Sequence, residues 1–390
     1  MIDRCKAFFS RPFWSDHRTL LALWLLLPII GGLVKINKCN NFLIFRYVFW
    51  HAWNGTSLYA PYPEEYHDVN HYGPFFSVVV APFAVLPQYL GVLLWVIALS
   101  MFLYVAIRKS QFTKYQQIFI LWFCAHELLT AIFMQQFNIA IAAVILLSYY
   151  CIEKEQDFWA AFFIMLGTFV KLYGIVGLAF FFFSRHKGRL VLSLVFWAVV
   201  MFAAPMVFHG PDYLIGQYQE WYESLSSKNA ENMFSTTTNV SILGMIRKIS
   251  QCATYSDIWI ILTGLVMFAL PYLRISQYKY IAFRQTLLAS VLMFVVLFST
   301  GSESSGYITP FVGIAIWYTA VPWQRTKWDV ALMIFAFILS SMSPSDLFPA
   351  YIRNTWVKPY ALKALPIALI WLKLCYEMYV RDYSEKPVAS

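Results

Sequence analysis

The stretch 157–184, DFWAAFFIMLGTFVKLYGIVGLAFFFFS, determines which class of fold is possible. Its only charged residues are Asp157 and Lys171. A helix that crosses a bilayer needs about 20 apolar residues, so this stretch is too long for one ordinary crossing and too short for two full ones. We therefore predict a pair of short or broken membrane helices, hinged near Lys171 and Gly174.

The rest of the chain is equally apolar. Of its 390 residues, 60% are hydrophobic and 13% are charged, whereas soluble domains average about 25% charged residues. Ten further apolar runs are predicted to cross a membrane: 19–36, 89–107, 116–133, 137–151, 190–208, 256–273, 285–300, 307–322, 327–343 and 360–380. The sequence thus predicts an all-α polytopic membrane protein of about twelve transmembrane helices, with residues 1–390 forming a single membrane domain.

The positive charges predict how the chain is oriented. The net charge of +9 is spread over short clusters between apolar runs, which is typical of cytoplasmic loops and does not indicate nucleic-acid binding. These clusters are Arg108–Lys114, Arg185–Arg189, Arg274–Arg284 and Arg325–Lys327. Placing them in the cytoplasm puts both termini there, and the segments 37–75, 209–255 and 344–358 on the opposite face. Because those segments mix polar and aromatic residues, we expect the active site to be extracytoplasmic.

The first of these segments contains an expected interfacial helix. The run NFLIFRYVFWHAW (41–53) places one set of apolar residues on a single helical face: Phe42, Phe45, Val48, Phe49 and Trp53. Arg46 and His51 fall elsewhere on the helical wheel. The run 75–87 is too short to span a membrane alone and is expected to dip into it.

A polar cluster, PYPEEYHDVNHYGPF (61–75), follows this helix. Its carboxylates and imidazoles could act as general bases or bind phosphate or sugar, and its prolines and glycine stiffen the loop. A metal site needs three or four convergent ligands, for which the spacing of His67 and His71 alone is weak evidence, and the six cysteines show no metal-binding spacing. The sequence therefore predicts neither a metal nor a cofactor.

Ionisable and amide groups within the apolar runs are further candidates. Lys171 lies in mid-segment, where a cation could hold a phosphate. His126 and Glu127 are expected to form a structural pair, and Glu303 lies in a serine-rich stretch that suggests a polar pocket. Gln136 and Asn138 suit sugar hydroxyls, although a tight turn is an equal explanation. Because no DxD pair is present, a lipid-linked sugar donor is favoured over a nucleotide sugar.

A series of landmarks over residues 35–320 resembles glycosyltransferase family 87 of the GT-C superfamily. These landmarks are NNFLIFRYVFWHAWNGTSLY (40–59), YGPFFSVVVAPFAVLP (72–87), QQFN (135–138), TFVKLYG (168–174), KNAENMFSTTTNVSILGMIRKI (228–249) and FSTGSESSGY (298–307). The resemblance implies a GT-C-like fold and transfer of mannose from a polyprenyl-phosphate donor. It also implies a lipid or glycan acceptor, inversion at the sugar, and no metal.

The chain departs from this family at two positions. The family's expected catalytic aspartate falls at Asn41, and its late histidine falls near Ser305 or Gly306. The catalytic candidates are therefore Asp68, Glu65 and Glu303, with Asp68 preferred, and the candidates for donor phosphate are Lys171 and His71. The candidates for substrate binding are Asn41, Arg46, Asn70, Tyr72, Gln136, Asn138, Asn232 and Asn239.

The sequence thus favours a membrane glycosyltransferase, expected in a bacterial plasma membrane and surrounded by membrane lipids. A transporter or lipid flippase has similar helices and intramembrane charges, but such proteins often contain broken helices in both halves. The same features also fit a polymerase or ligase of lipid-linked glycans, or a non-catalytic scaffold.

Overall fold

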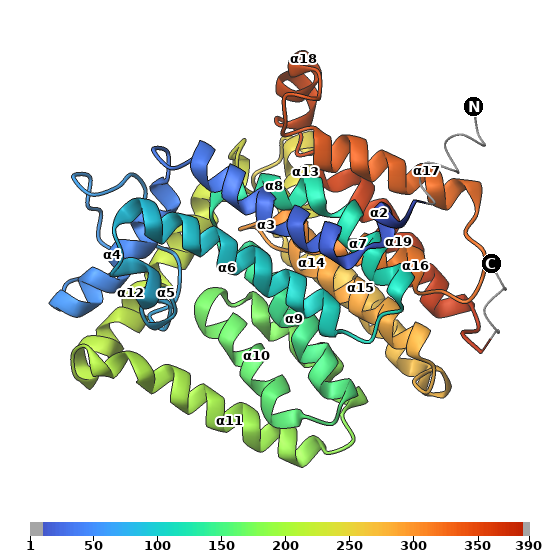
Figure 1. The fold of residues 1–390 in the computed structure, drawn as a ribbon, viewed down its shortest axis with the longest axis horizontal. Helices are drawn as coiled ribbons and strands as arrows, with labels where there is room; N and C mark the ends of the chain where they lie inside the picture. Colours follow the sequence, from blue (N-terminus) through green and yellow to red (C-terminus); the bar gives the residue numbers. More distant parts are fainter. Residues whose placement is uncertain (1–10, 385–390) are drawn as a thin grey trace.

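The computed structural model describes residues 11–384, and this part of the chain is helical with no β-strand (Figure 1). The first half contains α2 (Pro12–Ser15), α3 (His17–Val34), α4 (Asn40–Asn54), α5 (Phe76–Ala84), α6 (Gln88–Lys109), α7 (Lys114–Phe123), α8 (Ala125–Met134), α9 (Asn138–Glu153), α10 (Asp157–Lys171) and η1 (Tyr173–Phe183). The second half contains α11 (Lys187–Ala203), η2 (Ala204–Val207), α12 (Pro211–Glu231), η3 (Asn232–Phe234), α13 (Ile242–Ser250), α14 (Ile258–Ala269), η4 (Leu270–Leu273), η5 (Ile275–Gln277), α15 (Ile281–Leu297), η6 (Ser304–Tyr307), α16 (Ile308–Thr319), α17 (Lys327–Phe335), η7 (Ala336–Met342), α18 (Ala350–Ile352), η8 (Arg353–Val357) and α19 (Ala364–Val380). Cys5 and both chain ends lie outside the described residues.

Several of these helices have the character of membrane helices. Within residues 11–384, α3, α6 and the α11–η2 run are long and apolar enough to cross a membrane. The bent pair α7–α8 would make a fourth, and four further apolar helices are shorter. These helices support a polytopic membrane protein, whereas the expected number of about twelve crossings is not confirmed.

The stretch 157–184 forms a hairpin, as expected. Helix α10 ends at Lys171, Leu172 adopts a left-handed φ of 56°, and the 3₁₀-helix η1 runs back beside α10. Both arms are about 22 Å long, which is shorter than the hydrocarbon core of a bilayer. The two ends meet where Ser184 Oγ donates a hydrogen bond to Asp157 Oδ1 at 2.8 Å. Lys171 therefore lies at the apex of the hairpin.

Helix α4 has most of the expected apolar face, whereas its position at the membrane interface is not confirmed. Phe42, Phe45, Val48 and Phe49 are buried, but Trp53 is exposed. The expectation that His51 lies away from the buried face is wrong, because its side chain is buried and contacts Glu65 Oε2 at 2.8 Å. This hydrogen-bonding partner compensates for the burial of an imidazole that periodicity alone assigns to the polar face.

The expected crossing 116–133 is interrupted in the structure. The chain bends by 50° between α7 and α8, at Cys124. Within α8, the buried Glu127 accepts a hydrogen bond from Lys363 Nζ at 3.0 Å. Helix α8 therefore connects the N-terminal half of the chain with the segment that precedes α19.

Candidate functional site

A cavity of about 1180 Å³ is formed by segments that are far apart in the sequence. Its wall includes residues from all three segments expected to lie on one face: 37–75, 209–255 and 344–358. Helix α8, the end of α10 and the segment 299–305 also contribute to the wall. The three segments therefore contribute to one site, as their shared polar and aromatic character suggested.

Lys171 contacts several polar and aromatic groups in this cavity. Its Nζ donates a hydrogen bond to Asn138 Oδ1 at 2.7 Å and lies 5.4 Å from the Tyr72 ring centroid and 5.3 Å from that of Tyr173. No carboxylate of the described residues forms an ion pair with it. A cation that is held by an amide and two aromatic rings can still bind an anion.

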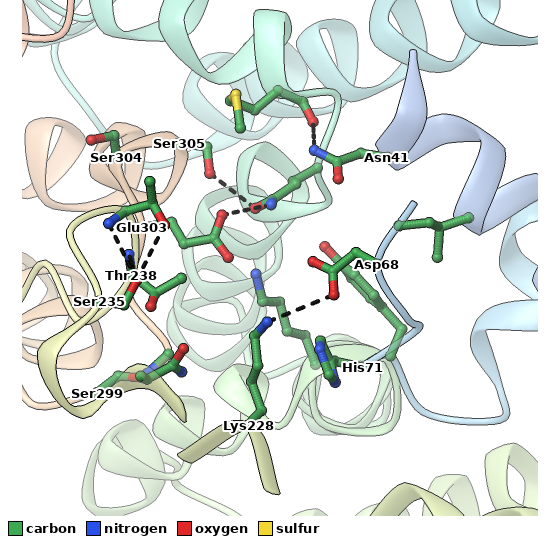
Figure 2. Close-up of a pocket in the computed structure, with 18 of the residues that line it drawn as sticks. Asn41, Asp68, His71, Lys228, Ser235, Thr238, Ser299, Glu303, Ser304 and Ser305 are labelled. Atoms are coloured by element: carbon green, nitrogen blue, oxygen red, sulfur yellow. Dashed lines mark hydrogen bonds and ion pairs between the residues drawn. The ribbon is translucent and has the colours of Figure 1, made fainter. Parts of the chain in front are cut away.

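A chain of amide and hydroxyl groups connects Lys171 to Glu303. Asn138 Nδ2 donates to Gln136 Oε1 at 2.8 Å and to Ser305 Oγ at 2.9 Å. Gln136 Nε2 in turn donates to Glu303 Oε2 at 2.7 Å. These contacts fix the amide orientations and leave the second Glu303 oxygen directed toward the cavity (Figure 2).

Asp68 is another of the carboxylates that line the cavity. It lies opposite Glu303, with its carboxylate near Lys228 (Figure 2); the distance from Lys228 Nζ to Asp68 Oδ1 is 3.8 Å. Asp68 Oδ1 also accepts a hydrogen bond from Val69 N at 2.9 Å. The Asp68 side chain is 59% exposed, so the contact with Lys228 is a weak, solvent-screened one.

The first loop rests directly on the hairpin. Gly73 N donates a hydrogen bond to Val170 O at 3.0 Å, and a Cβ atom at Gly73 would lie 2.1 Å from Phe169 O. Only glycine permits this close approach. The close approach brings Tyr72 beside Lys171. Trp221 Nε1 also donates a hydrogen bond to the His71 carbonyl oxygen at 2.9 Å.

His71 lines the cavity, but as a neutral group at pH 7. Burial is the largest cause that lowers its pKa to about 4; Lys228 and Lys171 act in the same direction, and Asp68 and Glu231 oppose them. Its Nδ1 lies 2.7 Å from Ser224 Oγ, which donates to Asn70 O at 3.1 Å. His71 is thus arranged for hydrogen bonding, and its assignment to the donor phosphate stays a prediction.

The remaining candidates divide into two groups. Asn41, Tyr72, Gln136 and Asn232 line the cavity, and Asn41 Nδ2 donates to Met134 O at 2.7 Å. The candidates outside the lining residues are Arg46, Glu65, Asn70, Asn138 and Asn239, of which Asn138 acts through Lys171. Asn70 is buried, and its Oδ1 accepts a hydrogen bond from Tyr72 N at 2.9 Å. Asn239 Oδ1 accepts a hydrogen bond from Ser241 Oγ at 2.7 Å.

Sequence reasoning missed three lysines in the wall: Lys35, Lys228 and Lys358. Each lies in or beside one of the polar segments, where a lysine is ordinarily a solvated surface residue. The aromatic neighbours Trp221 and Tyr173 could have marked the site, but the chain contains many aromatic residues. No group of three metal-ligating side chains occurs among the residues that the structure describes, so the donor set there does not suit a metal.

An apolar helical bundle with a polar, lysine-lined cavity defines a membrane protein that can hold a polar or amphiphilic substrate. Residues 70–300, more than half of the chain, match glycosyltransferase family 87, and the chain belongs to this family. The matched range includes Lys171, while Asp68 and Glu303 lie just outside its two ends. No curated protein matches the chain.

Proposed function

We propose that the protein transfers a sugar from a polyprenyl-phosphate donor to a lipid or glycan acceptor at the extracytoplasmic face of a bacterial plasma membrane. Mannose is the first candidate for the sugar. The observation that carries the proposal is Lys171, a cation at the apex of a membrane hairpin that forms no ion pair with a carboxylate of residues 11–384. Family membership supports glycosyl transfer, and it gives no support to a transporter.

The proposed reaction is a direct displacement with inversion. The acceptor hydroxyl oxygen attacks the anomeric carbon, and the bond from that carbon to the phosphate oxygen breaks. Polyprenyl phosphate leaves with the bonding electrons, and the hydroxyl proton passes to the Asp68 carboxylate. Because Asn41 cannot accept a proton in this way, a carboxylate elsewhere in the cavity is required.

The lysines stabilise the charge that develops on the leaving phosphate. Lys171 is the primary ligand, because few water molecules compete with it at the apex of the hairpin. With no DxD pair in the sequence, we assign this role to the side-chain cation and expect transfer to proceed without a metal. Glu303 and Gln136 are suited to accept and donate hydrogen bonds to sugar hydroxyls.

The proposal is tested with membranes that contain the full chain and a labelled polyprenyl-phosphate mannose. Lys171→Met should reduce transfer by about 100-fold, the typical effect of removing one preorganised electrostatic group. The exposed Lys38, outside the cavity lining, gives the matched control Lys38→Met, which should retain transfer.

Two isosteric variants identify the base. Asp68→Asn should abolish most transfer, whereas Glu303→Gln retains the hydrogen-bonding shape and should chiefly raise KM. If Glu303→Gln loses kcat and Asp68→Asn does not, Glu303 is the base. If Lys171→Met and Lys38→Met transfer equally well, the assignment of Lys171 is wrong.

A further inference from the structure

Helix α13 directs its charged side chains into the protein and its isoleucines toward the surface. Ile246 is 37% exposed and Ile249 is 56% exposed, whereas the neighbouring Arg247 and Lys248 are each 2% exposed. An ordinary amphipathic helix has the opposite arrangement, with its charges on the exposed face. Because burying a charge costs free energy unless polar partners compensate it, the partners of these two residues indicate what their burial serves.

The two buried cations bind different parts of the chain. Arg247 donates to three carbonyl oxygens and a carboxylate in the segment 252–257, which follows α13. Lys248 Nζ instead donates to Thr238 O at 3.1 Å and to Asn239 O at 3.3 Å, and no described carboxylate forms an ion pair with it. Burial lowers the pKa of Lys248 to about 8, so the amine is still mostly protonated at pH 7. Lys248 therefore anchors the loop that precedes α13.

This loop, residues 235–240, is part of the cavity wall and is called the threonine loop below. Its first four residues line the cavity, and Figure 2 shows Thr238 on the same side of the cavity as Glu303. Thr238 Oγ1 and Asn239 Nδ2 are buried and have no hydrogen-bond partner among the described residues. These two side-chain atoms do not hold the loop in place, so its position depends on backbone contacts such as those with Lys248.

The threonine loop in turn fixes the backbone beside Glu303. Val240 N donates a hydrogen bond to Ser302 O at 2.9 Å. On the other side of Glu303, Lys363 Nζ donates to Ser304 O at 3.0 Å. The carbonyl groups that flank this glutamate are therefore held by separate contacts, and the first of these contacts comes from the threonine loop.

We propose that Lys248 is a positioning residue for Glu303 that acts through the threonine loop. Its ammonium group holds two loop carbonyls against α13, which keeps Val240 bonded to Ser302 and the Glu303 carboxylate directed into the cavity. The anchoring rests on these contacts alone, whereas its effect on the donor sugar rests on the proposed function, in which Glu303 binds sugar hydroxyls. A lysine with a merely structural role would change stability without a selective change in the donor KM.

Amide hydrogen exchange tests the anchoring on the purified full chain in neutral detergent, without any substrate. Lys248→Met should accelerate exchange of the Val240 amide by about tenfold, because the loop loses its charge-assisted hydrogen bonds. The matched control is Arg247→Met, which removes an equally buried cation from the same helix and should leave exchange at Val240 unchanged. Equal exchange in wild type and Lys248→Met would overturn the proposal.

Transfer from labelled polyprenyl-phosphate mannose, in membranes that contain the full chain, tests the effect on Glu303. Lys248→Met should raise the donor KM by about tenfold with little change in kcat, whereas Arg247→Met should keep the wild-type KM. Because Lys248 acts through one carboxylate, the double variant Lys248→Met/Glu303→Gln should have the same KM as Glu303→Gln. A multiplied increase in the double variant, or a wild-type KM in Lys248→Met, would overturn the positioning role.

Failure of the proposed function gives a different pattern. In that case wild type transfers no sugar from this donor, but the Val240 amide still exchanges faster in Lys248→Met than in wild type and Arg247→Met. The exchange result then supports the anchoring by Lys248, and the donor assignment falls.

Discussion

His71 shows how its surroundings change the chemistry that a residue type suggests. Because its imidazole lies near three acidic residues in the sequence, it was a candidate for binding the donor phosphate. In the folded chain it is partly buried between Lys228 and Lys171, and its pKa falls to about 4. Burial and neighbouring lysines, which the local sequence does not reveal, decide its charge.

This lowered pKa predicts a pH dependence of stability. An unfolded chain holds histidine near its ordinary pKa of about 6.5, so between about pH 4 and 6.5 the unfolded state binds more protons. His71 therefore lowers stability as the pH falls through this window. We expect the thermal unfolding midpoint in detergent to fall less between pH 7.5 and 4.5 for His71→Asn than for wild type. His67→Asn, at an exposed neighbour, should keep the wild-type slope; equal slopes in all three proteins would contradict the prediction.

Lys171 was predictable because a mid-segment lysine is rare in an apolar run. Lys228 was not, because the polar segment around it contains many exposed charges of similar appearance. What distinguishes Lys228 is its position beside Asp68, a contact between residues 160 positions apart in the chain. Such contacts depend on how two loops meet, and neither loop carries a local signal for it.

At the scale of elements, the hairpin α10–η1 depends on close packing between its arms. A Cβ atom at Gly174 would lie 2.4 Å from the Gly167 carbonyl carbon. Glycine is required here because the two backbones approach more closely than any side chain permits.

Gly174→Ala should therefore separate the arms and destabilise the protein by about 1–3 kcal/mol, the usual cost of overpacking. Gly188→Ala is the matched control, because a Cβ atom there would meet nothing within 4 Å. Gly188 lies within α11, where alanine is favoured over glycine by up to about 1 kcal/mol. Thermal unfolding in detergent compares the two, and equal midpoints would show that the arms can shift without cost.

Sequence predicted this hairpin from its length and its central lysine and glycine. It did not predict the bend at Cys124 or the π-helical run Ala336–Met342, because both occur within continuous apolar segments. The two irregular elements contact each other: His126 Nδ1, just after the bend, lies 2.8 Å from Ser341 Oγ in the π-helical run. Periodicity identifies apolar runs, whereas breaks within them depend on partners from elsewhere in the chain.

At the scale of the whole molecule, a buried ion pair connects the C-terminal segment to the cavity wall. Lys363 Nζ donates to Glu127 Oε1 and to Ser304 O, each at 3.0 Å, and lies 4.3 Å from the Tyr307 ring centroid. Glu127 was expected to pair with His126, but its partner is 236 residues away. Lys363→Met leaves a buried carboxylate without compensation and should cost about 3–5 kcal/mol of unfolding free energy.

The double variant Lys363→Met/Glu127→Leu removes both charges and should recover much of that loss. Unfolding in detergent measures both variants against wild type. If the double variant is less stable than Lys363→Met, the destabilisation comes from lost packing, and the ion pair has no such role.

The orientation of the molecule can be tested with a native residue. Cys252 lies in the segment 209–255, and it is the one described cysteine that is not buried. A hydrogen bond from Thr254 lowers its thiol pKa, which favours the reactive thiolate. If this segment is extracytoplasmic, a membrane-impermeant maleimide should label intact cells that produce the wild type and should not label Cys252→Ser. In the opposite orientation, Cys252 reacts only after the cells are permeabilised. That result would place the cavity at the cytoplasmic face, because the same segment supplies Lys228 and Asn232 to its wall.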